Sequence, residues 1–87
     1  MNDERLRELV LEALLEIAPD VDAASLDPAI AFRDQFDFDS MDQLSFVIAL
    51  HQRLGVEVPE RDYPLLGSID AAVSYLQERP AAARTSP

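Results

Sequence analysis

The sequence contains no cysteine and no lysine. Without cysteine, the polypeptide has no disulfide, no thiolate zinc site and no thiol nucleophile of its own. All seven basic residues are arginine, they stand against 17 acidic residues, and the formal net charge is -10. Nucleic acid and anionic lipid repel such a surface, so we expect no nucleic-acid partner. The charge suits basic protein partners, or it serves solubility alone.

Long apolar runs are also missing. No stretch approaches the roughly 18 residues that a membrane span needs, and the amino terminus alternates charge where a signal peptide would be apolar. We therefore expect no membrane partner and a cytoplasmic location. With 87 residues the chain has the size of one small domain. We predict that residues 1–79 form this domain and that residues 80–87, which have no apolar stripe, are a disordered tail.

Three stretches have the periodicity of amphipathic helices. In residues 3–17 the apolar side chains Leu6, Leu9, Val10, Ala13, Leu14 and Ile17 recur at the spacing of one buried face. The central helix should run from Ser40 to Leu54, with Asp39 as its cap and Gly55 after its end. Its predicted buried stripe consists of Leu44, Val47, Ile48, His51 and Leu54, extended by Phe46, Ala49 and Leu50. The last helix, capped by Ser68, buries Ile69, Ala72, Val73 and Leu76 and ends before Pro80.

The connections between these helices have no period. Residues 20–39 hold six aspartates and a single base, Arg33, and we expect a long loop held down by its own apolar side chains. Single helical turns are possible at residues 25–27 and 28–32. Pro59 opens a short helix over residues 60–63, which Pro64 ends. The predicted fold is all-α: a small four-helix bundle of three main helices and one short helix, with a long first loop.

Ser40 lies where the acidic loop turns into the central helix. The start of a helix presents unpaired N–H groups and a partial positive charge, so a phosphate on this serine would be well placed. The commoner role of such a serine is that of a cap, with Gln43 completing a capping box. A hydrolase is disfavoured, because the one histidine, His51, lies about 16 Å farther along the helix and no G-x-S-x-G elbow is present. We predict no catalytic residue.

The aspartates around Ser40 do not form a calcium loop. Counted from Asp34 or Asp37, the sixth position is Asp39 or Asp42, where an EF-hand requires glycine. The twelfth position likewise lacks the bidentate glutamate. We therefore predict no specific metal site.

Several segments together resemble the acyl carrier proteins. Their attachment motif, Asp-Ser-Leu, leads into a helix that ends in Phe-Gly or Leu-Gly and a short extended link to proline. The matching segments here are Asp39-Ser40-Met41-Asp42, the apolar run 44–50, and Leu54-Gly55-Val56-Glu57-Val58-Pro59. Residues 68–76 are similar to the family's last helix, so the resemblance covers residues 3–79.

The resemblance implies a carrier domain that is not an enzyme. A phosphopantetheinyl transferase, using coenzyme A and a divalent metal, would convert the Ser40 hydroxyl into a 4′-phosphopantetheine phosphodiester. The thiol of this arm would hold an acyl group as a thioester, which fits a chain without cysteine. Asp39 would cap the helix and help orient the transferase complex, and Met41 would form the apolar rim beside the arm. The docking residues would be Asp37, Asp42, Gln43 and Phe46.

The implied partners are the transferase, a loading enzyme for the acyl or aminoacyl group, and downstream transferases, and we expect a monomer. Carriers of fatty acid synthesis usually have carboxylates two and five positions after the serine and more near the helix end. Here Asp42 is present, Ser45 replaces the second, and residues 42–54 carry one Asp and one Arg, a net charge of zero. Because such charges set association rates and partner choice, we predict a specialised pathway with its own loading enzyme.

Two alternatives remain open from the residues. Met41 and Tyr63 are also similar to the D-alanyl carrier proteins, which hold an amino acid. A different class of function is a helical adaptor, whose serine is unmodified and whose groove binds a partner helix.

Overall fold

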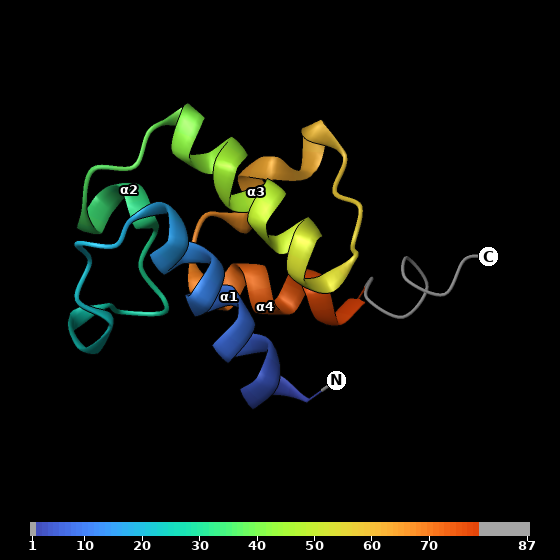
Figure 1. Ribbon diagram of the computed structural model, residues 1–87, viewed down its shortest axis with the longest axis horizontal. Coiled ribbons are helices and arrows are strands. Elements are labelled where there is room, and N and C mark those ends of the chain that lie inside the picture. Colours follow the sequence, from blue (N-terminus) through green and yellow to red (C-terminus); the bar gives the residue numbers. More distant parts are fainter. Residues whose placement is uncertain (1, 79–87) are drawn as a thin grey trace.

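The computed structural model describes residues 2–78, which form a bundle of helices with no strand in that range. In chain order the elements are α1 (Asp3–Ile17), the 3-10 helix η1 (Ala23–Ser25), α2 (Phe32–Gln35), α3 (Ser40–Leu54), the 3-10 helix η2 (Glu60–Leu66) and α4 (Ile69–Glu78). Figure 1 shows the first loop at one end of the bundle, leading up to the start of α3. The predicted all-α class is confirmed; the predicted tail lies outside the described residues. No helix of residues 2–78 is long and apolar enough to span a membrane.

Helix α1 forms the centre of the packing, against both α3 and α4. The side chain of Asn2 caps it by accepting a hydrogen bond from the N–H of Arg5 at 2.8 Å. Its buried residues are Leu6, Leu9, Val10, Ala13 and Leu14. The predicted apolar face is therefore correct except at its end, where Ile17 is only partly buried.

Helix α4 also buries the predicted face, with Tyr75 in addition. The hydroxyl of Ser68 accepts a hydrogen bond from the N–H of Ala71 at 3.1 Å, as its predicted capping role requires. The hydroxyl of Tyr75 donates to Oδ2 of Asp62 at 2.7 Å, which fastens η2 to α4. This hydrogen bond gives the buried tyrosine a polar partner at the edge of the core.

The short turns differ from the prediction in position. Helical turns occur at residues 23–25 and 32–35 and not at 25–27 and 28–32, and η2 continues through Pro64 to Leu66. Two long-range hydrogen bonds constrain the loop: the N–H of Phe32 donates to the carbonyl of Gly67 at 2.8 Å, and the N–H of Asp70 donates to the carbonyl of Pro28 at 3.0 Å. Tertiary partners, which local periodicity does not encode, thus hold both ends of residues 28–32.

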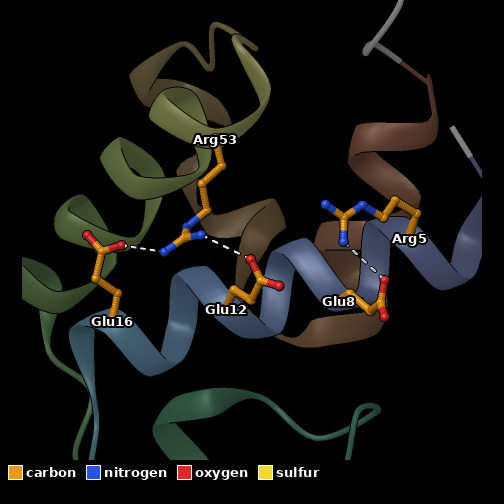
Figure 2. A network of polar contacts seen from close by, with 5 residues as sticks. All are labelled: Arg5, Glu8, Glu12, Glu16 and Arg53. Carbon is orange, nitrogen blue, oxygen red and sulfur yellow. Dashed lines mark hydrogen bonds and ion pairs between the residues drawn. The ribbon is translucent and has the colours of Figure 1, made fainter.

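Arg53 joins the far end of α3 to α1. Its guanidinium contacts Glu12 at 3.0 Å and Glu16 at 2.6 Å, and Figure 2 shows it placed between the two carboxylates. Glu12 and Glu16 are one turn apart on α1, so they face the same neighbour. These ion pairs are half exposed, so their net contribution to stability is small.

We expect Arg53→Met, which keeps the aliphatic stem, to lower the free energy of unfolding by about 1 kcal/mol or less. The difference should shrink in about 0.5 M NaCl, because salt screens exposed charges. Urea unfolding at low and high salt measures both effects. Arg61→Met is the control, since Arg61 is 82% exposed and only reaches Asp62 at 4.0 Å. A loss of several kcal/mol, or one independent of salt, would contradict this interpretation.

Candidate functional site

Ser40 is the first residue of α3 and is exposed. The predicted cap, Asp39, is confirmed: its Oδ1 accepts a hydrogen bond from the N–H of Asp42 at 2.9 Å, and the Asp42 carboxylate accepts from the N–H of Asp39 at 3.2 Å. This is a reciprocal capping box. The alternative box of Ser40 and Gln43 is absent, since the side chain of Gln43 donates to the carbonyl of Tyr63 at 2.7 Å. The Ser40 hydroxyl makes no hydrogen bond with any residue in 2–78.

We expect Asp39→Ala to lower the free energy of unfolding by about 1 kcal/mol, because the variant leaves the N–H of Asp42 without its acceptor. Asp39→Asn should lose less, since an amide oxygen still accepts. Urea unfolding measures the effect, and Asp37→Ala is the control, an exposed aspartate two residues before the cap. Equal stability of Asp39→Ala and wild type would show that the capping box contributes nothing.

An aromatic cluster holds the loop that leads to Ser40. The fully buried ring of Phe32 is the hub, with centroid distances of 6.0 Å to Phe36, 5.1 Å to Phe38 and 5.4 Å to Phe46. The ring of Phe46 is fully buried as well. Our prediction that Phe46 lies on the docking surface is therefore wrong: this ring attaches α3 to the loop and has no exposed surface for a partner.

The side chain of Gln35 fixes the loop on its outer side. Its amide oxygen accepts from the N–H of Asp27 at 2.9 Å, and its NH₂ group donates to the carbonyls of Asp27 and Ile30, both at 2.8 Å. An amide side chain suits this position because it donates and accepts at once. The sequence gives no signal for this role of Gln35, because a single glutamine in an aperiodic loop does not reveal its contacts.

The exposed face of α3 contradicts part of the predicted buried stripe. Leu44 is 38% exposed and Ile48 is 48% exposed, while the buried residues are Phe46, Val47, Ala49, Leu50 and Leu54. His51, also predicted in the stripe, is exposed, and its Nδ1 donates to the carbonyl of Val56 at 3.1 Å. Apolar residues occupy more than half of the helix circumference, so periodicity alone did not decide which of them face the loop and which face solvent.

An open groove of about 490 Å³ lies beside Ser40. Arg33 and Phe38 line it from the loop side, and Tyr63 and Pro64 line it from η2. A neighbouring hollow is lined by Arg33 and by the aspartates 37, 39 and 42. Within residues 2–78 no group of three or more His, Asp or Glu side chains is placed to hold a metal ion. The site thus combines a free hydroxyl, a groove with partly apolar walls, and a charged rim.

A helical bundle that presents one free serine hydroxyl at the start of its central helix has the architecture of a carrier domain. The family model described as a phosphopantetheine attachment site matches residues 4–76, and the chain belongs to this family. It is therefore an acyl carrier protein that bears a covalent 4′-phosphopantetheine, and the catalysis is performed by its partner enzymes.

Relatives named acyl carrier protein support this assignment. The chain is 35% identical over 80 residues to one from Zymomonas mobilis, an alignment that covers 90% of this chain and 94% of the relative. It is 29% identical over 79 residues to one from Rubrobacter xylanophilus, covering 87% of this chain and 98% of that protein. A third, from Solidesulfovibrio magneticus, is 26% identical over 76 residues, with 87% and 91% covered.

Proposed function

We propose that Ser40 is the residue that carries the phosphopantetheine arm. The observation that carries the proposal is that its exposed hydroxyl has no hydrogen-bond partner in residues 2–78 and borders the open groove. Of the other serines of this range, Ser25 donates its hydroxyl to Asp22 at 3.0 Å and Ser68 caps α4, while Ser45 and Ser74 lie inside helices and do not line the groove. Only a hydroxyl that is accessible and unbonded suits modification by a second enzyme.

The start of α3 fits a phosphodiester on Ser40. The first N–H groups of a helix have no partner within it. The capping box satisfies that of Asp42, whereas those of Ser40 and Met41 have no partner among residues 2–78. Once attached, the arm supplies the thiol that holds the acyl group as a thioester. The side chain of Met41, which is 67% exposed, would give this thiol arm an apolar rim, and Asp39 would help orient the transferase complex.

The test is the intact mass of the purified chain after incubation with coenzyme A, magnesium and a promiscuous phosphopantetheinyl transferase. We expect a gain of one phosphopantetheine, located by peptide mapping on the segment that contains Ser40. Absence of any gain with several transferases would contradict the proposal and favour the helical adaptor with an unmodified serine. A gain on another serine would contradict the choice of residue alone.

We further propose that the carrier serves a specialised pathway. The exposed side of α3 presents Met41, Leu44 and Ile48 at helical spacing, and Leu65 of η2 is 55% exposed. With a net charge of zero over residues 42–54, this surface suits a partner that docks through apolar contacts more than one with a strongly basic patch. Asp37, Asp42 and Gln43 would form its polar edge, while Phe46 is excluded by its burial.

Loading by a malonyl transferase of fatty acid synthesis tests this second proposal. We expect slow loading of the wild-type holo protein. Ser45→Glu should increase the rate several-fold at low salt, because it adds a carboxylate that steers a basic partner to this helix. Ser74→Glu, on the exposed side of α4, is the matched control and should change little. Efficient loading of the wild type would contradict the specialised role.

The proposed cargo is an acyl group, with an aminoacyl group as the alternative. Tyr63 is one of the two residues that carry the similarity to D-alanyl carriers. Its side chain also has a structural role, because it is partly buried against the core. The proposed partners are the phosphopantetheinyl transferase, a loading enzyme and downstream transferases. We propose that the carrier itself is a cytoplasmic monomer. The intact mass of protein isolated from its native cell would report both the arm and the group it carries.

A further inference from the structure

Arg33 makes no ion pair with an acidic residue of the described range 2–78. The guanidinium groups of the other arginines in residues 2–78, Arg5, Arg7, Arg53 and Arg61, each lie within 4.0 Å of a carboxylate. Arg33 makes no ion pair or hydrogen bond with any residue of that range, although it shares a hollow with three aspartates. Its cationic group is thus left available for another anion.

The position of Arg33 relates it to Ser40. It belongs to α2 and lines the groove that Ser40 also borders. In the sequence it is the only arginine between residues 8 and 52, and the chain has no lysine. Attachment at Ser40 would place a phosphodiester, with one negative charge, close to the carboxylates of Asp39 and Asp42. A nearby cation offsets that repulsion, and Arg33 is the base that the fold provides beside this groove.

We propose that Arg33 binds the phosphodiester of the arm on Ser40. This inference rests on the proposed function of Ser40. The planar guanidinium matches the paired oxygens of a phosphate, and the free N–H groups of Ser40 and Met41 supply further donors at the start of α3. Arg33 then acts as a positioning residue: it holds the base of the arm against the groove beside Tyr63 and Pro64, while the rest of the arm remains free to reach partner enzymes.

The experiment uses holo protein whose arm ends in a free thiol, so that the phosphodiester is the only anion on the arm. Wild type, Arg33→Gln, Arg33→Lys and Arg61→Gln are compared, each with full modification verified by mass. We expect the ³¹P resonance of the phosphodiester to move in Arg33→Gln, to move less in Arg33→Lys, and to stay in place in Arg61→Gln. The side-chain Nε–H resonance of Arg33 should shift between apo and holo wild type.

Thermal unfolding gives an independent measurement. Attachment of the arm changes the melting temperature of each variant. We expect this change to be more favourable in wild type than in Arg33→Gln by about 2–5 °C, as expected for one exposed charge pair in a domain of this size. The difference should decrease in about 0.5 M NaCl. Apo wild type and apo Arg33→Gln should melt alike, because Arg33 has no ion pair in the described structure.

The outcomes separate this inference from the proposed function. If every variant is modified on Ser40 but the ³¹P resonance is the same in wild type and Arg33→Gln, and the Nε–H resonance of Arg33 is the same in apo and holo wild type, the inference is wrong and the function stands. An effect of Arg33 that appears only when the thiol carries an acyl group with its own carboxylate would also overturn it, since Arg33 would then contact the cargo. If Ser40 is never modified, both fail together.

Discussion

Replacing Ser40 with alanine is expected to abolish attachment of phosphopantetheine completely and to leave the fold as stable as wild type. The first effect follows because the phosphodiester requires the Oγ atom. The second follows because Asp39, and not Ser40, caps α3, and the Ser40 hydroxyl has no hydrogen bond in residues 2–78. Were Ser40 the cap, the same substitution would lower the free energy of unfolding by about 1 kcal/mol.

Intact mass after transferase treatment and urea unfolding measure the two effects on the same preparation. Ser45→Ala is the matched control, a half-buried serine one and a half turns farther along α3, and it should be modified like wild type. Retained modification of Ser40→Ala would show that another residue carries the arm. A large loss of stability in Ser40→Ala would contradict the second part of the prediction, because the Ser40 hydroxyl would then support the fold.

Phe32→Ala is expected to lower the free energy of unfolding by about 3–5 kcal/mol. The ring of Phe32 is fully buried and contacts three other phenylalanine rings, so its removal leaves a cavity that the surrounding helices can only partly fill. Such a loss is a large part of the total stability of a small domain. The same cluster joins the loop to α3, so we also expect the loop before Ser40 to lose its fixed position.

Urea unfolding measures the loss. Phe32→Leu should lose less than half as much free energy of unfolding as Phe32→Ala, since leucine keeps most of the buried apolar volume. Ile30→Ala is the control on the same loop, because Ile30 is 42% exposed and should cost little. Hydrogen exchange of residues 30–40 reports whether the loop opens before the bundle does. If Phe32→Ala is as stable as Ile30→Ala, the aromatic cluster does not hold the loop.

The helices were predicted well where apolar residues form a single narrow stripe. The buried faces of α1 and α4 agree with the periodicity of their sequences, with Ile17 as the partly exposed exception. Helix α3 has apolar residues on most of its circumference, so the same method assigned Leu44 and Ile48 to the core, whereas they are exposed. Spacing along a helix defines which side chains share a face; the packing of neighbours decides which face is covered.

The sequence by itself determined the all-α class, the start of α3 at Ser40, the cap by Asp39 and the family to which the motif belongs. Only the tertiary structure decided that Phe46 faces the core and not a partner, that Leu44 and Ile48 are exposed, and that Arg33 borders the same groove as Ser40. The physical reason is the sequence separation of the residues that interact. Caps and helical periodicity depend on residues within one or two turns, whereas the loop is positioned by a ring cluster and hydrogen bonds between segments far apart in the chain.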